Sequence, residues 1–251
     1  MVTPSREPVR AGDAENGPLA SPTHMFPSNT SRSRAGFQRD LERLQHEVLV
    51  LASVVAKVTL RAVDALRSRD MAAACAIEAE GTLLNRRRFD IEEAARLLIA
   101  TQPVACDLRL LAAILHIVTD LERIGDYAAR IAHISVQIGD EPLINPLVDV
   151  PRIAEKSTST LRRSLHAFVE RDAAAAERIA KEDDVDHLYR QLYRELLTTM
   201  VANPRTVAQA THLLWVAHNL ARVADRVQNI RERVLFAVTG RMPLSRCSLD
   251  F

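Results

Sequence analysis

The chain has 251 residues, of which 47% are hydrophobic and 26% are charged. This composition excludes a protein that is disordered throughout and predicts a soluble chain with a sizeable apolar core. The 33 basic and 32 acidic residues leave a formal charge of +1. The charge balance therefore gives no indication of nucleic acid or an anionic membrane as a partner.

No segment predicts membrane insertion or secretion. The longest largely apolar stretch, Val48 to Ala56, is nine residues long, whereas a helix that spans a bilayer needs about twenty. The N-terminus lacks the apolar centre of a secretion signal. The three cysteines, Cys75, Cys106 and Cys247, are far apart and form no C-x-x-C pair. We therefore expect reduced thiols and a cytoplasmic location.

The N-terminal segment differs in composition from the rest of the chain. Residues 1–36 contain five of the eleven prolines and three of the seven glycines, without any apolar periodicity. This pattern predicts a disordered N-terminal tail. From Phe37 onward only four glycines remain, and no stretch alternates apolar and polar residues as a strand would. The folded part is therefore predicted to be all-α.

Apolar residues at steps of three and four predict long helices that pack on one another. The first helix carries such a seam from Leu41 to Ala65, and Ser68–Asp70 interrupts it. A second helix is expected to end near Ala100, and a third to run from Pro103 to Gly139.

The sequence then repeats itself. Arg69-Asp70 returns as Arg171-Asp172, Pro103 as Pro204, Gly139 as Gly240 and Leu121–Asp126 as Leu220–Asp225, at offsets of 99 to 102 residues. We therefore predict two tandem three-helix bundles, with six long helices in all. The predicted parts are a first repeat at 37–139, a linker at 140–150, a second repeat at 151–240 and a C-terminal tail at 241–251. The third and sixth helices, at about 34 residues, would be roughly 50 Å long.

The third helix carries the residues most suited to chemistry. Glu122 and Asp126 are one turn apart, and two carboxylates at that spacing repel each other. Arg123 and Arg130 could offset the repulsion as ordinary surface pairs. Alternatively, the carboxylates could supply oxygen ligands to a metal cation.

Three segments resemble the PhoU family of phosphate-uptake regulators: Gln102–Arg109, Thr119–Ala128 and Asn219–Arg226. The resemblance extends from about Phe37 to Gly240. It implies a two-bundle helical fold and a cytoplasmic accessory protein of the high-affinity phosphate ABC transporter. It also implies negative regulation of the phosphate-starvation response, and it suggests a homodimer.

The resemblance further implies an acidic E-or-D-x-x-x-D motif in each repeat that can bind iron or zinc. Glu122 and Asp126 match the motif, but the second repeat has Ala221 in place of the glutamate and keeps only Asp225. The expected metal ligands are therefore Glu122, Asp126 and Asp225. The substitution weakens the expectation of a second metal centre unless Asn219, His218 or a partner subunit adds ligands.

Other polar or aromatic groups are interpreted as structural. The four acids Glu182, Asp183, Asp184 and Asp186 could attract a cation, but charge runs on helices are usually solvated. The arginines Arg86–Arg88 could bind a phosphate or an acidic partner, but three consecutive residues cannot all face one ligand, so an ordinary solvated surface is expected. Trp215 is expected in the core rather than as a platform for a ligand. His218, Arg222, Asp225 and Asn229 share one helix face, which is consistent with hydrogen bonding between helices.

Enzyme motifs are missing from the sequence. It contains no glycine-rich phosphate loop, no G-x-S-x-G and no H-E-x-x-H, and a ferritin-like centre would need Glu-x-x-His on two helices. We therefore expect no enzymatic activity. The expected role is an adaptor between the ATPase subunit of the phosphate transporter and a sensor histidine kinase. The alternative is an iron- or zinc-dependent carboxylate helix with a redox or storage role.

Overall fold

A computed structural model of the protein describes residues 34–144, 147–180 and 185–241. These residues form seven α-helices, one 3₁₀ helix and no strand, which confirms the all-α class. The helices are α1 (Arg34–Ser68), α2 (Met71–Ile99), α3 (Ala105–Ile138), α4 (Asp149–Val169), α5 (Ala173–Ala180), α6 (Asp186–Ala202) and α7 (Val207–Thr239), with the 3₁₀ helix η1 (Pro204–Thr206) before α7.

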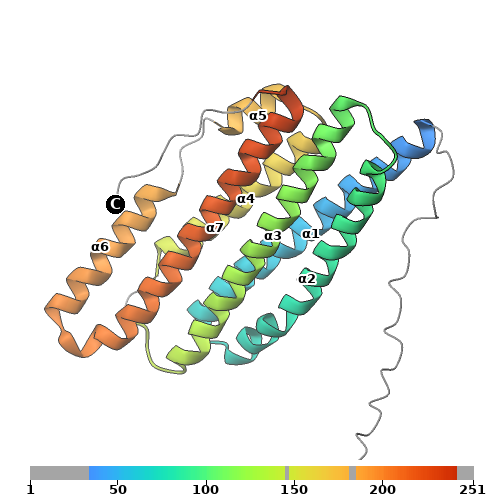
Figure 1. Cartoon of the computed structure of the whole chain (residues 1–251). Helices are drawn as coiled ribbons and strands as arrows, with labels where there is room; N and C mark the ends of the chain where they lie inside the picture. The colour runs from blue at the N-terminus through green and yellow to red at the C-terminus, as the bar shows by residue number, and fades with distance from the viewer. Residues whose placement is uncertain (1–33, 145–146, 181–184, 242–251) are drawn as a thin grey trace, which may run out of the picture.

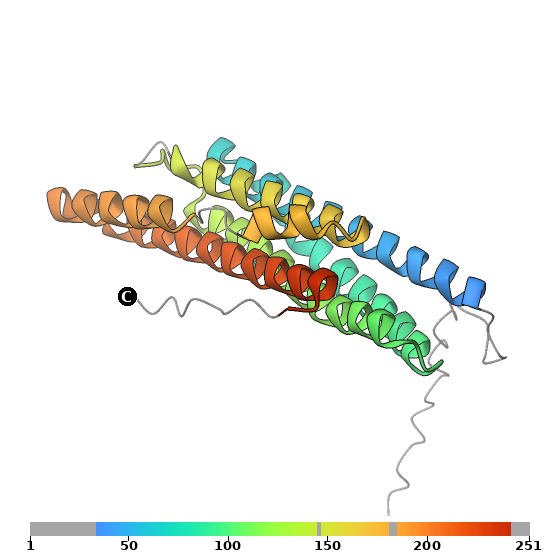
Figure 2. The same ribbon diagram turned by 90° about the horizontal axis from the view of Figure 1, so that it is seen from above.

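The helices lie roughly along one direction in two layers. In Figure 1, α2, α3, α7 and α6 lie side by side, with α1 and α4 behind them. Figure 2 shows the two layers from above. Helix α3 packs against α1, α2 and α7, so it occupies the centre of the molecule. Helices α3 and α7, the equivalent helices of the two repeats, run antiparallel and contact each other (Figure 1).

The duplication inferred from the sequence is visible at two equivalent helix corners. Arg69 and Arg171 both have a positive φ, of 57° and 53°. Each is followed by an aspartate, Asp70 or Asp172, whose Oδ1 accepts a hydrogen bond from the backbone N–H three residues later, at 2.9 Å in both corners. The left-handed residue lets the backbone N–H groups bond back to the last turn of the preceding helix. The same local sequence therefore gives the same turn twice.

The helix boundaries differ from the prediction in three places. Helix α1 already includes Arg34, before the predicted start at Phe37, and the Arg34 guanidinium pairs with Asp107 at 2.6 Å and lies over the Phe37 ring. Helix α4 begins at Asp149 rather than at residue 151. In the described part of the chain, α5 and α6 represent the second helix of the second repeat, so seven α-helices are described where six were predicted. Most of the predicted tails, at 1–33 and 242–251, lies outside the described residues.

The apolar core has two clusters, and both repeats contribute to each. One cluster joins Leu111 and Ile114 of α3 to Val227 and Ile230 of α7. The other, at the opposite end of the bundle, joins Ile131 of α3 to the first half of α7. The two helical bundles, one from each repeat, therefore pack against each other and share their apolar interior.

None of the helices described by the structure combines the length and the apolar character needed to cross a bilayer.

Candidate functional site

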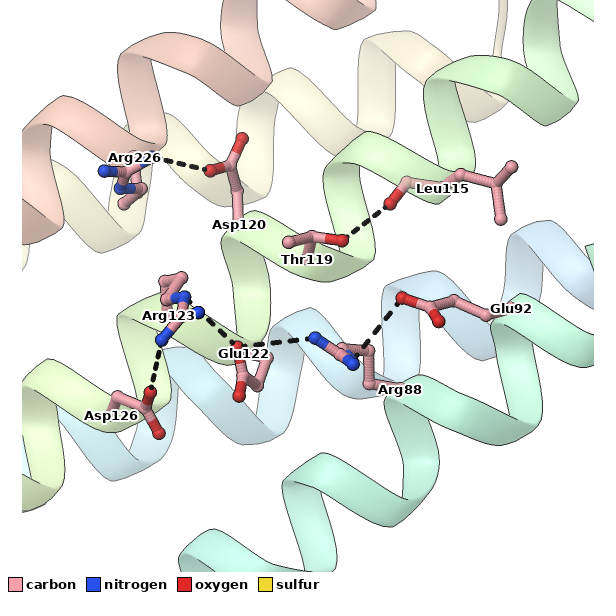
Figure 3. Close-up of polar contacts among 9 residues, drawn as sticks. All are labelled: Arg88, Glu92, Leu115, Thr119, Asp120, Glu122, Arg123, Asp126 and Arg226. Atoms are coloured by element: carbon pink, nitrogen blue, oxygen red, sulfur yellow. Dashed lines mark hydrogen bonds and ion pairs between the residues drawn. The ribbon is translucent and has the colours of Figure 1, made fainter.

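The acidic motif of α3 belongs to a row of alternating carboxylates and guanidinium groups (Figure 3). Glu122 lies between Arg88 of α2, at 3.8 Å, and Arg123, at 3.7 Å. Arg123 also donates a hydrogen bond to Asp126 at 3.3 Å, and Arg88 pairs with Glu92 at 3.4 Å. We name these five residues the α2–α3 charge row, since they connect the two helices across their contact.

Helix geometry explains why the row forms. Glu122 and Asp126 are one turn apart and therefore lie one above the other, while Leu121 and Ile124 of the same turns are fully buried. The Glu122 side chain is only 13% exposed, against 39% for Asp126. Burial raises the pKa of Glu122 above its ordinary value of 4.5, the Asp126 charge adds to the increase, and Arg123 and Arg88 offset part of it.

Two atoms of the row are incompletely satisfied. Glu122 Oε2 is buried and accepts no hydrogen bond, because both guanidinium groups lie beyond hydrogen-bond distance. Arg88 Nε is likewise buried without a hydrogen bond. Ion pairs at such distances compensate the loss of hydration only in part, in agreement with the raised pKa of Glu122.

A second pair lies toward α7 and joins the two repeats. Arg226 of α7 donates a hydrogen bond to Asp120 of α3 at 3.3 Å (Figure 3). Burial raises the pKa of Asp120, while hydrogen bonds from Arg226 and Asn229 oppose the increase. Burial acts to lower the pKa of Arg226, but Asp120 and Tyr127 together outweigh it and the pKa is raised. The pair is a polar contact between the two repeats, beside the apolar core that α3 and α7 share.

The second repeat keeps the arginine–aspartate pair of the motif but has no counterpart of Glu122. Arg222 donates to Asp225 at 3.1 Å, just as Arg123 donates to Asp126. Ala221 has no carboxylate to continue the row. Burial raises the pKa of Asp225; Arg222 opposes this increase, and Asp186 of α6 adds to it.

The structure therefore brings two of the three predicted ligands together. Glu122 and Asp126 belong to one charge row, whereas no contact described in the structure joins Asp225 to either of them. Asn219, a possible additional ligand, donates its amide to the Trp215 carbonyl at 2.7 Å.

These donors do not make a complete metal site within one chain. Among the residues that the structure describes, no group of three or more His, Cys, Asp or Glu side chains is placed to hold a metal ion. Iron and zinc sites in proteins typically use at least three or four protein donors, and the carboxylates here face guanidinium groups. Binding of iron or zinc by Glu122, Asp126 and Asp225 stays a prediction.

Both repeats match one protein-family model, the PhoU domain, over residues 48–135 and 150–234. The chain belongs to the PhoU family. A curated relative from Pseudomonas putida, named phosphate-specific transport system accessory protein PhoU homolog, is 34% identical over 81% of each chain. A relative of the same name from Clostridium acetobutylicum is 34% identical over 83% of this chain and 97% of its own.

Solved PhoU structures have the same fold. The crystal structure of PhoU from Pseudomonas aeruginosa superposes with a TM-score of 0.77 at 32% identity, covering 82% of this chain and all of the other. PhoU from Streptococcus pneumoniae, described as a phosphate transport system regulatory protein, gives a TM-score of 0.76 at 30% identity. The family resemblance inferred from the three motifs is therefore confirmed.

Two interpretations of single residues need revision. Arg88, expected to be a solvated arginine, has a side chain that is only 18% exposed and belongs to the charge row. Trp215, expected in the core, is 57% exposed, because the buried side of α7 is occupied by Leu213, Val216 and Ala217. Glu92 and Arg226 were not singled out by the sequence. The signal for Arg88 and Glu92 was their i,i+4 spacing, which is common on helices and therefore indicates little by itself.

Proposed function

We propose that this PhoU-family chain is a regulatory accessory protein of phosphate transport. In this role it restrains the phosphate-starvation response as a cytoplasmic adaptor between the transporter ATPase subunit and a sensor histidine kinase. The observation that carries the proposal is the family match in both repeats, together with relatives named as accessory proteins of the phosphate-specific transport system.

An exposed apolar stripe supports a function that depends on protein contacts. Tyr193, Leu197 and Val201 are 42%, 39% and 84% exposed. Their spacing of four residues places them along one side of α6, which lies at the edge of the bundle (Figure 1). Exposed apolar side chains that line up in this way are typical of interaction surfaces.

The alternative, a redox or storage function at a metal centre, has less support. Such chemistry needs carboxylates that are free to coordinate a metal, whereas Glu122 and Asp126 are paired with Arg88 and Arg123. An oxidase assay on protein loaded with iron tests this alternative directly.

Binding experiments and a reporter strain test the adaptor role. The purified full chain should bind the ATPase subunit and the cytoplasmic part of the kinase, and deletion of its gene should switch on a phosphate-starvation reporter in phosphate-rich medium. A double variant, Leu197→Glu with Val201→Glu, should weaken binding to at least one partner. Arg86→Glu, on exposed α2 surface, is the control. Normal repression in the deletion strain, or no binding to either partner, would contradict the proposal.

A further inference from the structure

A groove near the acidic motif is lined by residues that have no part in the function proposed above. It lies between the C-terminal half of α3 and the N-terminal half of α7 and has a volume of about 520 Å³. This volume is within the range of small-molecule sites. On α7 the groove extends from Thr211 to Arg222, about 16 Å at the usual helical rise.

The groove is lined by two arginines, one from each helix, and by three histidines. Its lining contains no aspartate or glutamate, but it contains Arg130, His133, His212, His218 and Arg222. Charged side chains of one sign in a partly enclosed groove strengthen the local electrostatic field and attract ligands of the opposite charge. The composition therefore favours an anion.

Neighbouring carboxylates neutralise only part of this charge. His133 contacts Glu78 at 2.7 Å, and Arg222 pairs with Asp225 at 3.1 Å. Arg130 makes no ion pair with a carboxylate of the described chain, and its guanidinium stacks on the Tyr127 ring at 5.5 Å. This arrangement leaves the donor groups of Arg130 available to a ligand and holds its plane in place.

An aromatic surface lies in the same groove. Trp215 is 57% exposed, and the His218 ring stands edge-on to it, with centroids 6.2 Å apart and planes at 84°. An exposed indole can stack on a planar ring, and the loss of its apolar surface from water favours that contact. A ligand that uses the whole groove therefore has a planar aromatic part as well as negative charge.

The geometry points to a nucleoside phosphate as the ligand of this groove, with its base stacked on Trp215 and its phosphate groups held by Arg130 and Arg222. Arginine suits this role because its planar set of donors matches phosphate oxygens in pairs. The hydrogen bond between Asp120 and Arg226 joins α3 and α7, the two helices that form the groove. This assignment does not depend on the adaptor role proposed above.

Fluorescence can test the assignment directly, because Trp215 is the only tryptophan in the chain. The full chain is titrated with ATP, AMP, adenosine and tripolyphosphate without added metal. We expect ATP or AMP to quench the Trp215 emission saturably, with a Kd in the range of roughly 1 to 100 µM. Adenosine and tripolyphosphate, which each lack one half of the ligand, should bind roughly ten-fold more weakly or worse.

Calorimetry on variants identifies the residues involved. Arg130→Gln and Arg222→Gln should each weaken ATP binding roughly ten-fold, because each removes a contact to the phosphate groups. Trp215→Leu should weaken ATP binding by a similar factor, because it removes the ring on which the base stacks. Arg86→Gln, which removes one charge from exposed α2 surface, is the matched control and should bind as the parent does. Retained helicity by circular dichroism shows that each variant is folded.

Two results would overturn the assignment. If tripolyphosphate bound as tightly as ATP, the groove would be an anion site without base recognition. If neither nucleotide bound at millimolar concentration to the folded parent chain, the groove would not be a nucleotide site at all.

Discussion

The two repeats have the same helix corners but differ at the turn that carries the acidic motif. Both retain an arginine and an aspartate three residues apart, as Arg123–Asp126 and Arg222–Asp225. Only the first repeat adds Glu122, which reaches Arg88 of the neighbouring helix. The retained pair lies within one helix. Glu122, in contrast, connects two helices, and its burial raises its pKa. The functional difference between the repeats is therefore expected at Glu122.

Metal loading should give the largest difference between the repeats. If the chain binds iron or zinc, Glu122→Ala with Asp126→Ala should abolish the metal content of the purified protein, because both ligands of the complete motif are lost. Asp225→Ala should reduce it far less, since Ala221 provides no second carboxylate. Elemental analysis with circular dichroism measures both effects. Equal loss from both variants would show that the two repeats form one shared site.

Truncation of the core should affect both repeats equally. Leu121 and Leu220 are fully buried at equivalent positions of α3 and α7. Leu121→Ala and Leu220→Ala should each lower the free energy of unfolding by about 3 kcal/mol. Because the apolar clusters combine both repeats, we expect one cooperative transition in urea for each variant. Two separated transitions would show that the repeats unfold as independent domains.

The ion pair between the repeats should contribute more to the free energy of unfolding than an ion pair within one helix. Asp120→Ala leaves the partly buried Arg226 without its partner, so we expect a loss of about 1 to 2 kcal/mol. Asp225→Ala removes a partner from the exposed Arg222 and should cost less than about 0.5 kcal/mol. Urea denaturation of both variants at neutral pH makes the comparison. Similar losses would contradict it.

The raised carboxyl pKa of Glu122 predicts a pH effect of definite sign. The folded state keeps this proton to higher pH than the unfolded chain does, so the contribution of the group is greatest below its ordinary pKa of 4.5 and declines as pH rises through the folded pKa. Glu122→Gln should remove that decline. The variant should therefore be at least as stable as the parent at about pH 7, with the difference disappearing near pH 4.

Urea denaturation over this pH range measures the effect. Glu93→Gln, whose parent side chain is 55% exposed, is the control and should follow the parent. A Glu122→Gln variant less stable than the parent at neutral pH would show that the arginines stabilise the ionised form.

A small stabilising effect is expected at the two equivalent corners. Arg69 and Arg171 have left-handed backbones that glycine adopts without steric cost. Arg171→Gly should stabilise the fold by roughly 0.5 to 1 kcal/mol. Arg69→Gly should gain less, because the Arg69 side chain donates to the Asp140 carbonyl at 3.0 Å. Thermal unfolding of both variants measures the difference, and a larger gain at Arg69 would contradict it.

The sequence predicted local features well and contacts between helices poorly. The apolar periodicity, the Arg-Asp corners and the glycines after α3 and α7 each depend on residues close together in the chain, so the helices and their duplication could be recognised. The pairing of Arg88 with Glu122 depends on how α2 packs against α3. An arginine in a run of three gives no indication of which one faces a neighbour.

By itself, the sequence determined the helical class, the duplication, the family and the spacing of Glu122 and Asp126, because helix geometry places residues four apart on one face. Only the tertiary structure decided that these carboxylates meet Arg88, that Asp120 pairs with Arg226, and that Trp215 lines a groove between the repeats. The physical reason is that burial and charge pairing depend on which helix faces are brought together. That choice is made by packing across the whole bundle.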